Sequence, residues 1–147
     1  MIYYTMSILK ALKDRDFEKL KTFNIEEIKN KSHILNNACI CHSELKVIKY
    51  LVDNGCDINN QENGDGKTAL HEACHSRNDF EVIKYLVESG GNIKLKDNYG
   101  MSVLKYACRC KSSLKIIRYL IKKGCEVHSD ILHSVCYSRL DIEIIKY

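Results

Sequence analysis

Residues 71–75 read His-Glu-Ala-Cys-His and match HExxH, which on a helix is the pattern of zinc metalloproteases. Histidines four positions apart share one helix face, so His71 and His75 could both bind zinc while Glu72 activates a metal-bound water. A third ligand is missing, because no histidine follows in the spacing HExxHxxGxxH and position 78 is Asn. The pattern itself fixes only three residues, so the rest of the chain must decide whether it is a site.

A second set of possible zinc ligands lies near the C-terminus, in the spacing Cys125-x2-His128-x4-His133-x2-Cys136. Two cysteines and two histidines can bind structural zinc tetrahedrally. Elsewhere the sequence offers little chemistry. The stretch Asn63-Gly64-Asp65-Gly66 is neither a dinucleotide fingerprint nor a P-loop, and no nucleophile lies beside a base.

Length and composition limit the classes of protein. The 147 residues, 45% of them hydrophobic, suit one domain with a sizeable core. No apolar stretch approaches the roughly 20 residues of a membrane span. The N-terminus lacks the basic n-region of a signal peptide, so we expect an intracellular, cytoplasmic protein with reduced cysteines. A net charge of +4, spread along the chain, does not predict nucleic-acid binding.

Four segments of the chain align with one another. Each contains a leucine that marks the common register, with steps of 35, 34 and 28 residues: Leu35, Leu70, Leu104 and Leu132. A period of this size is typical of architectures built from stacked repeats.

Each segment predicts two short antiparallel helices. The first helix begins after an N-cap candidate, Thr68, Ser102 or Asp130, and continues with a Leu-x-x-Ala-Cys type of sequence whose small residues allow close packing. The second helix, 80–87 in the second segment, has apolar residues at i, i+3, i+6 and i+7, and Gly90 suits its C-terminal end.

These units resemble ankyrin repeats. The family's motifs appear most completely in the second segment, as Asp65-Gly66-Lys67-Thr68-Ala69-Leu70-His71, Glu81-Val82-Ile83-Lys84-Tyr85-Leu86, Gly90-Gly91-Asn92-Ile93 and Asp97-Asn98-Tyr99-Gly100. The resemblance covers about residues 32–147. It implies an all-α solenoid of stacked antiparallel helix pairs with short β-hairpin fingers.

We expect a single ankyrin-repeat domain over residues 1–147. Its parts are a degenerate N-terminal capping helix pair (1–31), repeat 1 (32–65), repeat 2 (66–99), repeat 3 with a shortened finger (100–128) and an incomplete repeat 4 (129–147). The stretch Val127 to Asp130 is too short for a finger like 59–67 or 94–101. The last helix would lack a capping repeat, which predicts that the chain is a fragment of a longer protein.

The repeat register changes the interpretation of the possible metal ligands. The resemblance implies that His71 is buried and bonds the backbone of the adjoining loop, while His75 lies on the concave surface. For the C-terminal set, a structural interpretation is favoured over a zinc clip. In this interpretation Cys125 and Cys136 have packing roles, His133 takes a position like that of His71, and His128 lies in a loop. We therefore expect no enzyme activity, no metal and no cofactor.

Six of the eight cysteines fall in two repeat columns, where a small hydrophobe suits the packing: Cys39, Cys74, Cys108 and Cys136, then Cys56 and Cys125. Equivalent positions in stacked helices lie roughly 10 Å apart, whereas a disulfide needs Cα atoms within about 7 Å. The columns therefore predict free thiols.

The resemblance implies recognition of a protein through the finger tips and the C-terminal ends of the first helices. At the finger tips we predict contacts from Glu62, Asn63, Asp65, Lys67, Asp97, Asn98, Tyr99 and Met101. At the helix ends we predict contacts from Ile40, His42, His75, Ser76, Arg77, Arg109, Lys111, Tyr137 and Arg139. A basic column, His42, Arg77, Lys111 and Arg139, favours an acidic partner, and Tyr99, Met101 and Tyr137 are candidate apolar anchors.

The sequence thus predicts a monomeric, non-catalytic adaptor or scaffold that binds a protein partner, with no small-molecule substrate and no membrane insertion. An alternative is a regulatory or substrate-recruiting segment of a larger enzyme or effector that extends beyond residue 147. Binding of the basic column to nucleic acid is a third, disfavoured possibility, which salt-dependent binding to random oligonucleotides would test. Repeat frameworks fix shape and leave contact residues free, so the sequence does not identify the partner.

Overall fold

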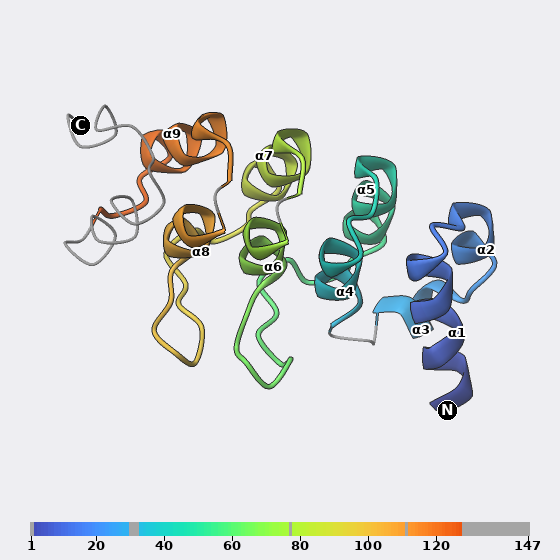
Figure 1. The fold of residues 1–147 in the computed structure, drawn as a ribbon. Helices are drawn as coiled ribbons and strands as arrows, with labels where there is room; N and C mark the ends of the chain where they lie inside the picture. The colour runs from blue at the N-terminus through green and yellow to red at the C-terminus, as the bar shows by residue number, and fades with distance from the viewer. Residues whose placement is uncertain (1, 30–32, 77, 111, 128–147) are drawn as a thin grey trace.

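The computed structural model describes residues 2–29, 33–76, 78–110 and 112–127 (Figure 1). These residues form nine helices: α1 (Ile2–Lys13), α2 (Phe17–Lys21), α3 (Ile25–Lys29), α4 (Ile34–Ile40), α5 (Leu45–Asp53), α6 (Ala69–His75), α7 (Phe80–Glu88), α8 (Val103–Arg109) and α9 (Leu114–Lys122). None of the helices in this part of the chain is long and apolar enough to cross a membrane.

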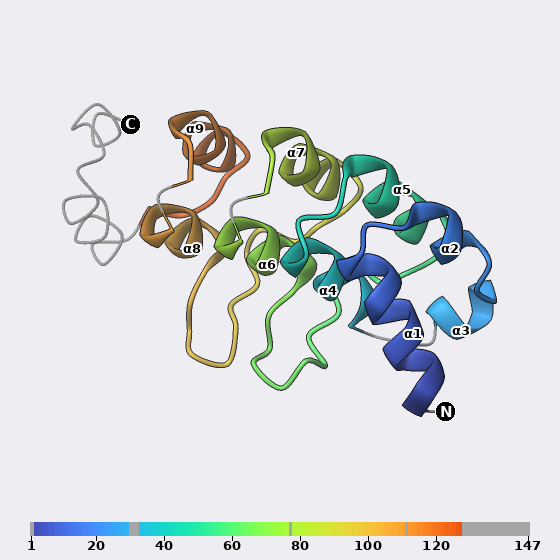
Figure 2. The same cartoon turned by 45° about the vertical axis from the view of Figure 1, so that its right-hand side comes forward.

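The helices stack in two rows. The inner row contains α4, α6 and α8, the outer row contains α5, α7 and α9, and each inner helix packs on its own outer helix and on the next inner helix (Figure 1). Two long loops, the first finger (59–67) and the second finger (94–101), project side by side from the same edge of the stack, as the rotated view also shows (Figure 2). This arrangement confirms the predicted solenoid of helix pairs.

The inner helices begin where the N-cap residues predict. The Thr68 hydroxyl accepts a bond from the His71 N–H, and the Ser102 hydroxyl accepts one from the Lys105 N–H, so each cap satisfies a free backbone donor of the first turn. Nearly every residue of α6 from Ala69 to Cys74 is buried, because the helix has neighbours on three sides.

The outer helices bury one face and end at glycine. In α7 the buried residues are Val82, Ile83 and Leu86. The chain then leaves the helix through Gly90 at φ +100°, a left-handed conformation that favours glycine. A Cβ at the next residue, Gly91, would lie 2.7 Å from the Leu86 carbonyl oxygen, so a side chain here would require the backbone to shift.

Neighbouring repeats are joined by hydrogen bonds as well as by apolar packing. The buried Asn78 amide donates to the Cys39 carbonyl at 2.8 Å, and the Ser112 hydroxyl donates to the Cys74 carbonyl at 3.4 Å. Both donors lie in the turn between an inner and an outer helix, and both acceptors lie in the preceding inner helix. These bonds fix the position of each of these repeats relative to the preceding repeat in the stack.

The N-terminal segment continues the stack. Helices α1 and α2 form where the degenerate pair was predicted, and their Ile8, Leu12 and Leu20 join the common core. Phe17 packs edge-on against Tyr50 at a centroid distance of 5.6 Å. Helix α3 was not predicted from the sequence, although its Ile28 is fully buried.

The fingers carry little β structure. Among the described residues a single antiparallel bridge pairs Lys96 with Ser102, so the two fingers are loops held mainly by side-chain bonds. The predicted fourth repeat lies outside the described residues.

Candidate functional site

The first histidine of the HExxH pattern is committed to holding the second finger. His71 is fully buried, and its Nδ1 accepts the Thr68 N–H at 3.2 Å. The ring proton is therefore on Nε2, which donates to the Met101 carbonyl at 3.2 Å. The bond to the adjoining loop that the resemblance implied is present, and neither ring nitrogen is free for a metal.

The rest of the pattern does not converge on a metal position. His75 lies on the exposed side of α6, with its Nδ1 3.6 Å from a Glu72 carboxylate oxygen. Within the described residues no group of three or more His, Cys, Asp or Glu side chains is arranged to hold a metal ion. Of the C-terminal ligand set, only Cys125 is described, and its buried thiol lies 3.9 Å from the Ile93 carbonyl oxygen. The remaining three residues, His128, His133 and Cys136, lie outside the described part.

Burial of His71 makes stability depend on pH. Desolvation lowers the pKa of His71, although the Asp97 carboxylate and the Met101 carbonyl act to raise it. The folded chain therefore keeps His71 neutral at a pH where the unfolded chain takes up a proton. The stabilising effect is complete above the unfolded pKa of about 6.5 and is lost as the pH falls from there towards the lower folded pKa.

We expect the free energy of unfolding to fall more steeply between pH 7 and pH 5 in the wild-type chain than in His71→Asn. The difference between the two slopes is at most about 1.4 kcal/mol per pH unit, the value for one proton. Urea denaturation at a series of pH values measures it. All other titrating groups are common to both proteins, so parallel pH profiles would contradict a buried neutral His71.

The buried cysteines of the described residues are inert thiols. All seven described cysteines are free, and five of them are buried. Burial raises the pKa of Cys56 and Cys108 to about 11 and that of Cys125 to about 12, and it raises the pKa of Cys39 and Cys74 further. Thiols that stay protonated are poor nucleophiles and poor metal ligands.

Several predicted finger-tip residues are exposed. Tyr99 is the most exposed large hydrophobic residue in the described part of the chain, at 73%, and Asn98, Glu62 and Asp65 are also exposed. Asn63 is half-buried because its side chain holds its own loop: Oδ1 accepts the Lys67 N–H at 3.0 Å and Nδ2 donates to the Lys67 carbonyl at 2.7 Å.

Two of the predicted finger-tip contacts do not lie on the surface. Met101 is 7% exposed and belongs to the core, so its assignment as an exposed apolar anchor is wrong. Asp97 is 6% exposed, and its carboxylate accepts bonds from the Met101 N–H, the Tyr99 N–H and the Tyr106 hydroxyl, at 2.8, 2.9 and 2.7 Å. Burial acts to raise the pKa of Asp97, but these bonds outweigh it and the pKa lies below its ordinary value.

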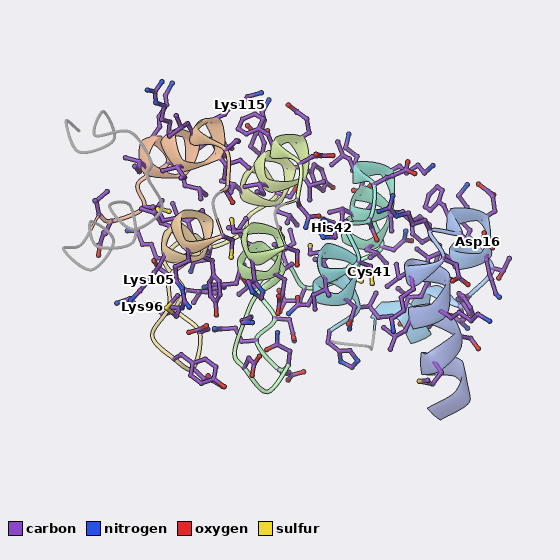
Figure 3. The ribbon with its side chains drawn as sticks, viewed as in Figure 1. Asp16, Cys41, His42, Lys96, Lys105 and Lys115 are labelled. Atoms are coloured by element: carbon purple, nitrogen blue, oxygen red, sulfur yellow. The ribbon has the colours of Figure 1, made fainter. Side chains whose placement is uncertain are left out.

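The predicted helix-end residues lie along one edge of the inner row. Ile40, His75 and Arg109 occupy equivalent positions in α4, α6 and α8, and all three are exposed. His42 is exposed just beyond α4, where it adopts a left-handed φ of 52° (Figure 3). Ser76 is half-buried. The other predicted contacts, Arg77, Lys111, Tyr137 and Arg139, lie outside the described residues.

A charged and aromatic cluster connects the helix ends to the fingers. Lys67 reaches from the first finger to 5.3 Å from the centre of the Tyr106 ring, and its Nζ lies 3.7 Å from both Asp65 and Glu72. The ring of His75 packs against Tyr106 at a centroid distance of 5.3 Å. Glu72, the residue of the HExxH pattern that would activate a metal-bound water, is thus a buried ion-pair partner.

Sequence reasoning missed Glu72 and Tyr106. Both take the same position in successive inner helices, since Glu72 follows Leu70 by two residues and Tyr106 follows Leu104 by two. That shared position is the signal that could have identified them as neighbours across the repeat boundary.

The comparisons with known proteins agree with this architecture. A search of curated proteins finds no match to the chain. The family model described as ankyrin repeats in three copies matches residues 35–131, about two thirds of the chain, which includes the inner and outer helices α4 to α9. With its stacked helix pairs, its buried His71 and this match, the chain belongs to the ankyrin repeat family.

Proposed function

We propose that this chain is a non-catalytic adaptor that binds a protein partner on the inner face, the surface made by the finger tips and the C-terminal ends of α4, α6 and α8. Ankyrin repeats are generally protein–protein interaction modules. The observation that carries the proposal is the exposed row Ile40, His75 and Arg109, one residue from each repeat at the same helix position.

The three side chains of the exposed row lie outside the hydrophobic core, which supports a role in binding. Ile40 is 46% exposed although it is a large apolar residue, and Tyr99 adds a more exposed ring on the second finger. Arg109 forms no ion pair with any residue that the structure describes, and its Nη1 lies 4.0 Å from Met101 Sδ. Tyrosine and arginine are residue types that often dominate binding energy.

The charges favour an acidic partner segment. His42 and Arg109 are exposed at the helix ends, and two carboxylates of the adjoining cluster, Glu72 and Asp97, are buried and already paired. An incoming carboxylate can therefore reach Arg109, whose planar guanidinium forms two parallel hydrogen bonds with such a group. The predicted basic residues Arg77, Lys111 and Arg139 would add to this preference.

We expect Tyr99→Ala and Arg109→Ala each to weaken partner binding by about 1 to 2 kcal/mol, roughly 5- to 30-fold. Neither change should alter the free energy of unfolding by more than about 0.5 kcal/mol, because both side chains are exposed. The partner is first identified by affinity purification of the full-length product, and binding is then measured by calorimetry. Unfolding caused by Tyr99→Ala would show that the surface assignment is wrong.

The alternative function, a recruiting segment of a larger enzyme or effector, uses the same inner face. It differs only in requiring a catalytic or effector part beyond residue 147, so the downstream open reading frame distinguishes it from a free-standing adaptor.

A further inference from the structure

The two fingers are copies of one loop. In the first finger Asn63 Oδ1 accepts the Lys67 N–H at 3.0 Å, and in the second Asp97 Oδ1 accepts the Met101 N–H at 2.8 Å. The glycine between them has the same left-handed conformation in both loops, with φ +70° at Gly66 and +71° at Gly100. In this register Gly64 corresponds to Asn98, and Asp65 corresponds to Tyr99.

The first finger has its outer edge covered by the second. The backbone N–H of Asn98 donates to the Asp65 carbonyl at 3.0 Å, and its side-chain Nδ2 donates to the Gly64 carbonyl at 2.8 Å. A Cβ added at Gly66 would collide with the Asn98 side chain, so the asparagine fills the space above this glycine. The Tyr99 hydroxyl lies 3.5 Å from Asp65 Oδ1 and extends the contact.

The matching edge of the second finger is open. A Cβ added at Gly100 would meet nothing within 4 Å. The carbonyls of Asn98 and Tyr99, which correspond to those that Asn98 itself binds in the first finger, accept no hydrogen bond from any described residue. The two fingers therefore carry the same binding edge. In the first finger this edge is bound by Asn98, and in the second finger no described residue binds it.

A hollow of about 120 Å³ lies at the base of the second finger. Its lining includes Lys94 and Lys96 from the second finger, Ser102 just before α8, and Cys125 and Glu126 beyond α9. Lys96 pairs through a β-bridge with Ser102, the N-cap residue of α8. Both lysines and Glu126 are exposed, so the hollow is lined by charges of both signs.

The chain's repeat pattern supplies no third finger for this edge. Eight residues separate Ile93 from Ser102, whereas only two separate Val127 from Asp130, the corresponding N-cap candidate. A second copy of the chain fits poorly as well. Its first finger has Gly64 and Asp65 where an asparagine amide is needed, and its second finger already uses Asn98 against its own first finger.

We propose that the open edge of the second finger binds a reverse turn of a partner protein that carries asparagine followed by an aromatic residue. The asparagine backbone N–H and side-chain amide bond the Tyr99 and Asn98 carbonyls and fill the space above Gly100. The aromatic ring packs on the exposed ring of Tyr99. This contact lies on the side of the finger and goes beyond the proposed binding by the inner face.

The probe is the turn that already makes this contact within the chain, a cyclic peptide of residues 95–102, Leu-Lys-Asp-Asn-Tyr-Gly-Met-Ser. It is titrated into the full ¹⁵N-labelled chain. We expect saturable shift changes at the Gly100 and Tyr99 amides and none at Gly66, whose edge is occupied. Replacing the asparagine of the peptide with alanine removes the side-chain bond and should weaken binding about tenfold.

A matched pair of variants locates the contact. Gly100→Asn fills the open space with a residue that tolerates positive φ, so it should abolish peptide binding. Gly64→Asn makes the same substitution at a glycine with φ +78° and an open Cβ position in the other finger, so binding should persist. The proposal is overturned if the Gly100 amide does not respond, as it would not if residues 128–147 cover the edge. It is also overturned if the alanine peptide binds equally well. Neither result bears on partner binding through Arg109.

Discussion

Ile83→Ala is expected to lower the free energy of unfolding by about 2 to 5 kcal/mol. Ile83 has no exposed surface, and it lies in the middle of α7, between the outer helices α5 and α9. Truncation removes buried apolar surface and leaves a cavity that helices fixed on both sides cannot collapse to fill. Urea denaturation followed by circular dichroism measures the effect.

The matched control for this prediction is Lys84→Ala, the neighbouring residue of the same helix. Its side chain is not part of the core, so the change should stay within about 0.5 kcal/mol. Because each repeat contacts only its neighbours, the α7 variant should unfold first in its own repeat, and the transition should broaden. A loss below about 1 kcal/mol would contradict the packing described for α7.

His71→Ala is expected to lower the free energy of unfolding by about 2 to 4 kcal/mol. It leaves the Met101 carbonyl and the Thr68 N–H without their buried partner and opens a cavity under the second finger. The finger should loosen as a unit, which hydrogen exchange at the Met101 and Tyr99 amides would detect.

The chain contains its own control for this histidine. Asn36 takes the same position in the first repeat, and its Nδ2 donates to the Lys67 carbonyl at 2.7 Å, as His71 donates to Met101. His71→Asn should therefore recover more than half of the stability that His71→Ala loses. Equal losses in the two variants would show that the contribution comes from ring packing rather than from the bond to the finger.

The repeated elements of the fold could be predicted from the sequence. Thr68 and Ser102 cap helices because a hydroxyl can accept a first-turn N–H in any repeat, and the apolar spacing of 80–87 needs no knowledge of its neighbours. Helix α3 was missed because it is one five-residue helix with no counterpart among the repeats. The expected β-hairpins are not shown beyond one bridge, because the fingers are held by the side chains of Asn63 and Asp97 rather than by a backbone ladder.

In the candidate site, the exposure of a side chain could be predicted only where it depends on residues of a single repeat. The exposed positions of Ile40, His75 and Arg109 were expected from the repeat register and the resemblance to ankyrin repeats. The burial of Asp97 and Met101 depends on Tyr106 and His71, which approach the finger from two different repeats. The position of Lys67 over the Tyr106 ring likewise joins residues 39 positions apart, and nothing in the order of residues indicates that pairing.

Two hydrogen bonds fix the positions of neighbouring repeats along the stack, from Asn78 to Cys39 and from Ser112 to Cys74. In both bonds the acceptor is a main-chain carbonyl. Every amino acid supplies such a carbonyl, so the acceptor persists whatever side chain stands there. Repeats connected in this way are interchangeable, because duplication or loss of a whole repeat in the gene preserves the hydrogen bonds to the repeats on either side. The length of the protein, and with it the span of partner it can cover, can therefore evolve in steps of one helix pair, each adding roughly 10 Å.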